Sequence, residues 1–211
     1  MHKPLPLSYY QNRDVLFLGK DLLGKLLFTQ INGVVTCGII NETESYRGPD
    51  DKACHAYNFR RTERNKMMYA VGGHSYVYMC YGMHYLFNIV TSVLDEPHAV
   101  LIRSIYPLIG QHIMHKRRKS TTDYPHLTYG PGKTAQALGI DRSFNGERLD
   151  SKKIWIQESL ITVDSNKIEE LPRVGVDYAG EHARLPWRFR IENSWLETII
   201  ANMSLSAQLG E

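Results

Sequence analysis

Residues 26–42, LLFTQINGVVTCGIINE, hold two runs of strand-forming residues on either side of the dipeptide Asn32-Gly33. Asn-Gly favours a tight turn in which both central residues take a positive φ, and this turn joins the strands of a β-hairpin. The stretch therefore predicts antiparallel strands at residues 26–31 and 34–42. Neighbouring pairs of this kind build an antiparallel sheet, because parallel strands need long crossover connections.

Further segments with regular apolar patterns flank this hairpin. Before it, residues 14–23 carry apolar side chains at helical spacing and are followed by Gly24, a typical helix C-terminal glycine. After it, the patterns predict strands at 75–80, 85–91, 99–105, 153–157, 161–163 and 187–191, and helices near 64–69 and at 109–117 and 131–138. No repeat or linker interrupts them. We expect a single α+β domain over residues 1–211, with a mixed, mainly antiparallel sheet and surrounding helices.

The composition is that of an ordinary globular chain of 211 residues. Lys and Arg number 25 against 22 Asp and Glu, and the resulting net charge of +3 excludes a histone-like polycation. Three cysteines, an odd number without a close pair, disfavour a disulfide framework or a four-cysteine zinc site. No signal-peptide core and no run of roughly 20 apolar residues is present. We expect a cytoplasmic (or nuclear) protein without membrane association, and nothing requires more than a monomer.

Two short segments hold residue types that suit chemistry. Glu42 and Glu44 are two apart on a predicted strand, so both side chains face one side, and in a pocket one of them can act as a general base on water. Exposed glutamate pairs on strands are also common. Tyr76 and Tyr78 likewise share a strand face, and Tyr81 lies at a bend, where an exposed aromatic can wedge between bases. A half-buried strand rich in aromatics has the same pattern, so periodicity alone leaves both interpretations open.

Nine segments in consistent order make roughly residues 12–192 resemble the alkyladenine DNA glycosylase family, the mammalian-type 3-methyladenine DNA glycosylases. The matching residues are Glu42-Thr43-Glu44-Ser45-Tyr46 with Gly48-Pro49-Asp50, His55, Thr62 with Arg64-Asn65, Tyr76-Val77-Tyr78, Tyr81-Gly82-Met83, Asn88-Ile89-Val90, Leu101 with Arg103, Gly130-Pro131-Gly132-Lys133, and Arg173-Val174-Gly175-Val176 with Ala179-Gly180. Two positions depart from the family pattern: Glu63 stands where many relatives have proline, and Asp177 where glycine is common. These departures concern substrate breadth and affinity rather than reaction type.

This resemblance implies a single-domain fold with a protruding β-hairpin that inserts into DNA. It also implies hydrolysis of the N-glycosidic bond of alkylated or deaminated purines in double-stranded DNA, namely 3-methyladenine, 7-methylguanine, hypoxanthine and ethenoadenine, with an abasic site as product. Enzymes of this type flip the damaged nucleotide out of the duplex and bind it in a pocket. The resemblance implies neither a cofactor nor a metal ion.

Matched residue by residue, the resemblance also implies roles in the site. Glu44 matches the catalytic carboxylate, Arg103 an arginine near the attacking water, and the carbonyl of Val174 a backbone acceptor for that water. The residues that match the pocket for the flipped base are Tyr46, His55, Tyr78 and Asn88. Tyr81 matches the tyrosine that fills the gap in the base stack. The further expected DNA contacts are Arg60, Arg64, Leu101 and Lys133.

Charge and two alternative functions complete the sequence evidence. Basic clusters at 60–66 and 116–119 flank an acidic segment at 42–51, which suits a rim that faces phosphates, although surface clusters are more often only solvated. A damaged-base-binding protein without catalysis would not need Glu44, and an RNA or nucleoside N-glycosidase would not need a stack-filling Tyr81. A metal-dependent hydrolase is the most remote alternative, because His112 and His115 lack a third ligand.

Overall fold

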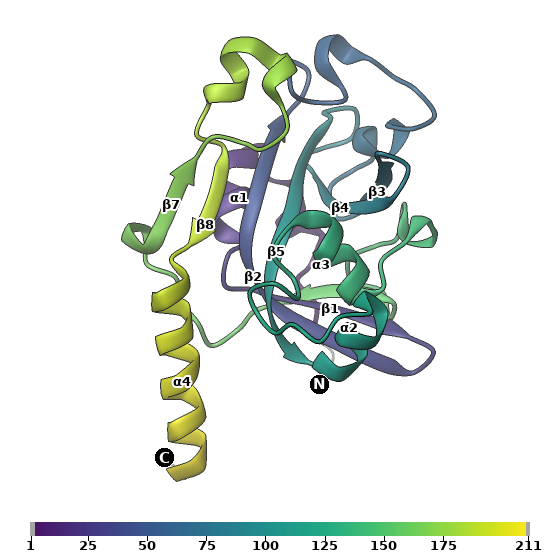
Figure 1. The fold of residues 1–211 in the computed structure, drawn as a ribbon. Coiled ribbons are helices and arrows are strands. Elements are labelled where there is room, and N and C mark those ends of the chain that lie inside the picture. Colours follow the sequence, from purple (N-terminus) through teal and green to yellow (C-terminus); the bar gives the residue numbers. More distant parts are fainter. Residues whose placement is uncertain (1–2, 210–211) are drawn as a thin grey trace.

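The computed structural model describes residues 3–209, and the side chains of residues 3–203 (Figure 1). Its sheet runs in the order β3-β4-β5-β2-β1-β6, and β8 pairs with both β2 and β7. Every strand pairing in this part of the chain is antiparallel, which confirms the α+β architecture. The strands are β1 (Leu26–Ile31), β2 (Val34–Arg47), β3 (Ser75–Cys80), β4 (His84–Thr91), β5 (His98–Ile109), β6 (Ile154–Gln157), β7 (Ile168–Leu171) and β8 (Arg188–Ile191).

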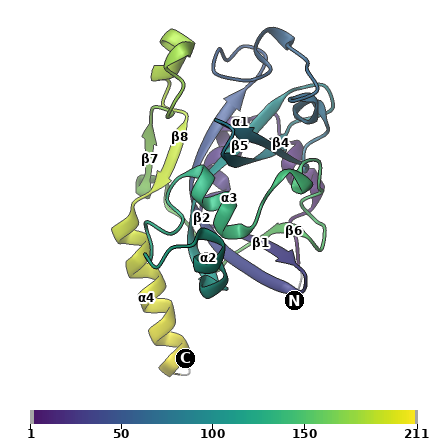
Figure 2. The ribbon, with the colours of Figure 1, turned by 45° about the vertical axis from the view of Figure 1, so that its right-hand side comes forward.

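Helices and short 3-10 segments surround this sheet. The α-helices are α1 (Val15–Asp21), α2 (Gln111–Arg118), α3 (Pro131–Leu138) and α4 (Asn193–Leu209). The 3-10 segments are η1 (Leu7–Gln11), η2 (Tyr57–Phe59), η3 (Lys66–Tyr69), η4 (Arg142–Phe144), η5 (Ser165–Lys167) and η6 (Asp177–Arg184). Figure 2 shows α4 leading away from β8 at one edge of the molecule. No helix in the described part of the chain is long and apolar enough to cross a membrane.

The β1–β2 hairpin forms where the Asn-Gly pair predicts it. Asn32 and Gly33 take φ values of 51° and 79°, and the pairing runs from Ile31↔Val34 back to Leu26↔Ile39. Strand β2 does not stop near residue 42 but continues to Arg47, because β5 pairs with it along most of its length. Beyond the end of β1, β8 takes over the other edge of β2 at residues 42–44. The long strand β2 is therefore covered on both edges where it carries the two glutamates.

Alternation along β2 separates the core from the site. The hydroxyls of Thr43 and Ser45 donate to backbone carbonyls of α1, at 2.7 and 2.8 Å. Helix α1 lies so close to this face that a Cβ added at Gly19 would be 2.3 Å from the Ser45 hydroxyl oxygen. Since successive strand residues point to opposite faces, Glu44 and Tyr46 point away from α1. The packing of α1 thus directs the acidic residue and the aromatic residue to the other side of the sheet.

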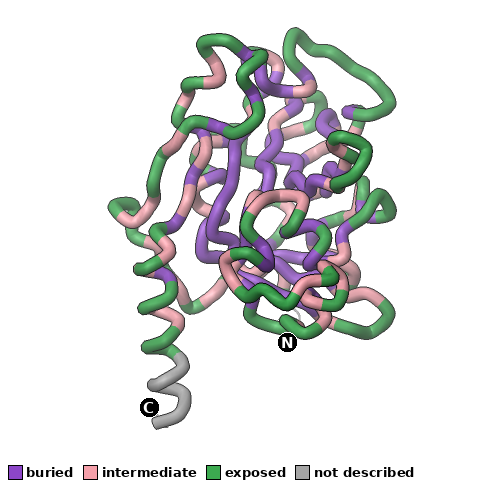
Figure 3. Tube along the Cα trace, viewed as in Figure 1, coloured by how far each residue is buried: buried purple, intermediate pink, exposed green. Residues whose placement is uncertain are grey.

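The main core fills the space between the sheet and its helices. It includes Leu18 and Leu22 of the α1 region, Ile39 of β2 and Ile102 of β5, all at most 2 % exposed. Figure 3 shows the buried residues concentrated in the central strands, while the loops around them are largely exposed. A second, smaller cluster contains Met68 and Tyr76, and the partly buried Tyr78 packs against it. The aromatic residues of β3 are therefore held in place by apolar packing.

Besides β2 and β5, which are longer than predicted, the elements predicted at 161–163 and 109–117 differ in the structure, and β7 and α4 have no counterpart in the sequence patterns. The predicted strand at 161–163 is wrong: Ser159 accepts from the Ile161 amide (3.0 Å) and donates to the Gly24 carbonyl (2.7 Å), which fixes an irregular segment there. The helix predicted at 109–117 begins at Gln111, because residue 109 still belongs to β5 and Gly110 has a left-handed φ of 76°. Strand β7 has two exposed glutamates at its centre and no apolar alternation, and α4 was not indicated either.

Candidate active site

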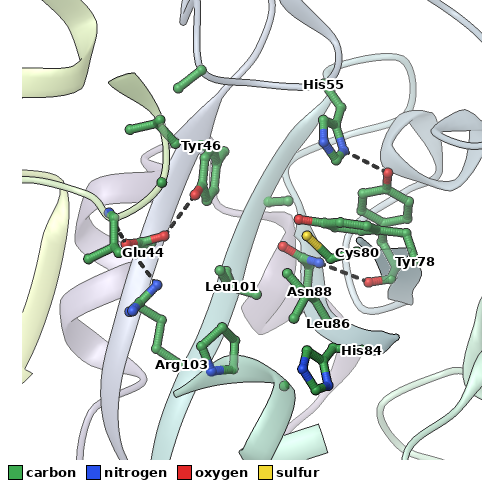
Figure 4. Close-up of a pocket in the computed structure, with 18 of the residues that line it drawn as sticks. Glu44, Tyr46, His55, Tyr78, Cys80, His84, Leu86, Asn88, Leu101 and Arg103 are labelled. Carbon is green, nitrogen blue, oxygen red and sulfur yellow. Dashed lines mark hydrogen bonds and ion pairs between the residues drawn. The ribbon is translucent and has the colours of Figure 1, made fainter. Parts of the chain in front are cut away.

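A cavity of about 610 Å³ opens on the face of the sheet that carries Glu44 and Tyr46 (Figure 4). The strand register explains its floor, since Glu44 pairs with Leu101, Leu101 with Asn88, and Asn88 with Tyr76. Directly paired residues of antiparallel strands point to the same face, so these four side chains form a row across four strands. The volume lies in the range of small-molecule sites and suits a purine nucleotide.

Glu44 is fully buried and receives two hydrogen bonds and one ion pair. Its Oε1 accepts from the Val174 amide at 2.8 Å and forms an ion pair with Arg103 Nη1 at 3.1 Å, and its Oε2 accepts from the Tyr46 hydroxyl at 2.7 Å. Burial raises the pKa of Glu44 above the ordinary carboxyl range, while Arg103, the Tyr46 hydroxyl and the Val174 amide oppose this rise by stabilising the carboxylate. The result is an oriented carboxylate of raised basicity, which is what a general base acting on water needs.

Arg103 contacts both glutamates of the predicted pair. Its Nη1 lies at Glu44, and its Nε donates to Glu42 Oε1 at 3.2 Å, which confirms that the two carboxylates face the same side. The same Glu42 oxygen accepts from Arg188 Nη1 at 2.9 Å. Only Glu44 of the two lines the cavity. The pair therefore divides into one carboxylate that lines the pocket and one that holds Arg103, which also lines the pocket.

The opposite wall of the cavity is aromatic. The rings of His55 and Tyr78 are 4.7 Å apart, those of Tyr76 and Tyr78 are 5.2 Å apart, and His55 Nδ1 shares a 2.9 Å hydrogen bond with the Tyr76 hydroxyl. Burial lowers the pKa of His55 to about 4, with Arg64 and Arg60 adding to the effect. His55 is therefore neutral at neutral pH, and this wall presents aromatic faces without an imidazolium charge. Tyr76, which the sequence pattern placed on the strand face of Tyr78 without giving it a role, is also a site residue.

Two residues of the floor are fixed by the strands around them. Asn88 is buried in β4 and its amide nitrogen donates to the Tyr76 carbonyl at 3.1 Å, which sets the orientation of its side chain. Leu101 in β5 is only 3 % exposed and lies between Glu44 and Asn88. Leu101 can therefore contact only a DNA group that enters the cavity. It cannot contact the outside of the duplex.

A buried ion pair holds the loop that carries Val174. Arg173 forms two hydrogen bonds with the carboxylate of Asp51, one of them 2.8 Å long between Nη2 and Oδ1, and donates to the Ser45 carbonyl at 3.0 Å. Both side chains are fully buried, and the guanidinium lies 4.9 Å from the centre of the Tyr46 ring. This pair joins segments 122 residues apart, and no local pattern in the sequence indicates it. It fixes the Val174 amide against Glu44.

The β3–β4 hairpin presents its tip beside the cavity. Tyr81 is 83 % exposed, Met83 is 71 % exposed, and Tyr81 also lines the cavity. Tyr81 and Gly82 take φ values of 51° and 68°. A left-handed conformation is unfavourable for a bulky residue such as tyrosine, and such strain is often found where a side chain has to be presented in a fixed direction. The hairpin is the protruding element that the resemblance implies.

The predicted basic cluster at 60–66 is partly neutralised. Arg61 forms an ion pair with Asp95, and Lys66 forms one with Glu63 at 2.8 Å, all four on the surface. Glu63, the departure from the family pattern, therefore removes one positive charge from this segment. The three basic residues named as DNA contacts are exposed: Arg60, Arg64 and Lys133.

Arg64 also contacts an aromatic ring at the edge of the cavity. In helix α2, some of the basic side chains form hydrogen bonds within the protein. The Arg64 guanidinium lies 4.9 Å from the centre of the Tyr78 ring. In the second basic cluster, Arg117 donates to Thr36 and Arg118 to Gln136, at 3.0 and 2.6 Å. These bonds connect α2 to β2 and α3, so only part of this cluster is available to phosphates. Within residues 3–209 no three His, Cys, Asp or Glu side chains gather as a set of metal ligands.

Comparison with known proteins identifies the family. Residues 9–195 match the model of the methylpurine-DNA glycosylase (MPG) family. Among curated relatives named "Putative 3-methyladenine DNA glycosylase", one from Chlamydia felis is 54% identical over 88% of this chain and 94% of its own length. One from Natranaerobius thermophilus is 43% identical over 90% of this chain and 96% of its own, and one from Bacillus cereus 42% over 89% and 95%. The chain belongs to the methylpurine-DNA glycosylase family and is a DNA glycosylase of DNA repair.

Proposed function

We propose that this glycosylase removes alkylated and deaminated purines, namely 3-methyladenine, 7-methylguanine, hypoxanthine and ethenoadenine, from double-stranded DNA. The damaged nucleotide flips into the cavity, where a water activated by Glu44 attacks its anomeric carbon and leaves an abasic site. The observation that carries the proposal is the buried Glu44 carboxylate, held by two hydrogen bonds and an ion pair and facing an aromatic wall. A flat base fits against that wall while its sugar lies toward the carboxylate.

Hydrolysis of the N-glycosidic bond needs a general base for the water and a negative charge that stabilises the positive charge on the sugar. Glu44 accepts a proton from water, the resulting hydroxyl bonds to the anomeric carbon, and the electron pair of the N-glycosidic bond leaves with the purine. The ionised carboxylate also stabilises the positive charge that develops on the sugar. In alkylated purines the ring is already cationic, which weakens the bond and favours contact with the faces of Tyr46 and Tyr78, by about 0.5–2 kcal/mol for a good contact.

Arg103 and Val174 prepare the carboxylate for this step. Arg103 contacts Glu44 and Glu42 together, so its position is set from two sides. The resemblance assigns the carbonyl of Val174 to the water, and the structure adds a bond from the Val174 amide to Glu44. No lysine lines the cavity in the described part of the chain. We therefore propose a monofunctional enzyme that does not cut the strand through a Schiff base.

Tyr81 supports a duplex substrate rather than a free nucleoside. Its exposed ring stands beside the cavity mouth on a strained turn, where it can occupy the gap that the flipped base leaves in the stack. A nucleoside leaves no such gap. The same argument disfavours an enzyme that acts only on unpaired nucleotides.

The test uses a duplex with one hypoxanthine or ethenoadenine, incubated with a chelator and then treated with alkali. Strand scission only after alkali supports monofunctional excision, and scission without alkali contradicts it. Glu44→Gln should bind the duplex and lose excision, whereas Glu158→Gln, at a surface glutamate paired with Lys25, should keep it. Full excision by the Glu44 variant would refute the assignment. The absence of abasic sites for every lesion, 3-methyladenine included, would indicate a binding protein.

A further inference from the structure

Tyr178 is an exposed aromatic residue at the cavity that the proposed mechanism does not use. Its ring is 71 % exposed, yet it is among the residues that line the cavity. It comes from η6, the segment that follows the loop of Val174. Its hydroxyl donates to the carbonyl of Ala53 at 3.0 Å, so the polar end of the side chain is bonded and the flat apolar face is left toward solvent.

The surroundings hold this ring in place. The Lys52 amide donates to His182 Nδ1 at 3.2 Å, and Lys52 Nζ forms an ion pair with Glu181 at 2.8 Å, so η6 is joined to the loop before His55 at several points. Partial burial raises the pKa of Tyr178, and the nearby Asp51 carboxylate adds to the rise. The phenol therefore stays protonated at neutral pH and keeps its bond to the loop. An exposed ring fixed in this way loses little conformational freedom when it binds a ligand.

Tyr178 and Tyr81 border the cavity from different segments. Tyr81 is at the tip of the β3–β4 hairpin, and η6 lies on the other side of the ends of β2 and β5 in Figure 1. If a nucleotide of a DNA strand enters the cavity, the rest of that strand has to run past the segments that border the mouth, η6 among them. Tyr81 accounts for the gap in the duplex, and it lies near enough to Tyr178 to add to the rise in the pKa of that phenol, which leaves Tyr178 to contact the strand beside the gap. Base and deoxyribose surfaces both pack well on a tyrosine face.

We propose that Tyr178 is a second DNA-contacting aromatic, on whose ring the damaged strand packs a flat apolar surface at the mouth of the cavity. That surface is either the base next to the flipped nucleotide or the deoxyribose of the flipped nucleotide itself. The inference rests on the proposed base-flipping function. Because the contact is made with the strand and not with the reacting atoms, it strengthens binding of the flipped state.

Binding of a lesion duplex by Glu44→Gln protein, measured by fluorescence anisotropy, tests the contact without turnover. Adding Tyr178→Ala to the Glu44→Gln protein should raise Kd by about 5- to 150-fold, the usual range for loss of a stacked base. Tyr178→Phe keeps the ring but loses the bond to Ala53, so its Kd should lie between those of the parent and of Tyr178→Ala, nearer to the parent. Phe17→Ala, which removes a ring 49 % exposed on α1 at the other face of the sheet, is the matched control and should leave Kd unchanged.

Equal Kd values for Tyr178→Ala and the Phe17 control would overturn the proposal, and so would a Tyr178→Phe variant as weak as Tyr178→Ala. A duplex with a tetrahydrofuran abasic analogue beside the lesion then separates the two surfaces. If the difference between parent and Tyr178→Ala disappears, the ring stacks on the neighbouring base; if it persists, the ring packs on the deoxyribose. Failure of the proposed function is distinguishable, because the wild-type protein would then release no base at all.

Discussion

Tyr46→Phe removes one hydrogen bond from the catalytic carboxylate and leaves the ring in place. Two hydrogen bonds and an ion pair hold Glu44. The Tyr46 hydroxyl is the nearest of these groups at 2.7 Å, followed by the Val174 amide at 2.8 Å and the Arg103 guanidinium at 3.1 Å. Hydrogen bonds to a charged group contribute about 1.5–3 kcal/mol. We expect the free energy of unfolding at neutral pH to fall by about that amount, because Glu44 is fully buried and its Oε2 loses the donor that stabilises its charge.

Tyr46→Phe should also shift the pH dependence of excision in one direction. The Tyr46 hydroxyl stabilises the ionised form of Glu44 and so lowers its pKa; without it, burial raises the pKa further. Glu44 has to be ionised to accept a proton, so the acid limb of the excision rate should move to higher pH in Tyr46→Phe. The loss of stability should be largest at neutral pH and smaller in acid, where Glu44 is protonated and the hydroxyl no longer bonds a charge.

Single-turnover excision across pH and urea unfolding at two pH values measure both effects. Tyr57→Phe, which removes the hydroxyl of a ring 42 % exposed at the surface, is the control and should change neither. An acid limb that stays in place, or moves to lower pH, would refute the idea that this hydroxyl sets the proton affinity of Glu44. A stability loss that is equal at both pH values would show that the bond does not depend on the charge.

Three further outcomes are expected. Asp51→Ala leaves Arg173 buried without its carboxylate and should cost about 3–5 kcal/mol in urea unfolding, against at most about 1 kcal/mol for Asp95→Ala in the exposed pair with Arg61. Glu44→Gln should be more stable than wild type at neutral pH, because the raised pKa of Glu44 means that its ionisation destabilises the folded wild-type protein. The difference in free energy of unfolding between the two proteins should disappear as the pH falls below the ordinary carboxyl range, and urea unfolding at both pH values measures it. Arg60→Ala should lower the slope of log affinity against log salt by about one unit, and an unchanged slope would reject its placement on a phosphate.

The sequence alone determined those features that depend on neighbours along the chain. The Asn32-Gly33 turn and its hairpin follow from the φ values that this dipeptide accepts. The shared side of Glu42 and Glu44 follows from the two-residue period of a strand, and the same period applies to Tyr76 and Tyr78. Periodicity left open whether these residues line a catalytic pocket or belong to ordinary half-buried strands. The family resemblance favoured the catalytic pocket.

Only the tertiary structure decided which distant residues complete the site. Three features of the site join segments that are far apart in the chain. They are the Arg173–Asp51 ion pair, the row of side chains that includes Glu44 and Leu101, and Tyr178 at the cavity mouth. The packing of α1 against one face of β2 decides which side of that strand becomes the pocket. Such contacts depend on strand register and on burial summed over the whole fold, and neither quantity is encoded in any short stretch of sequence.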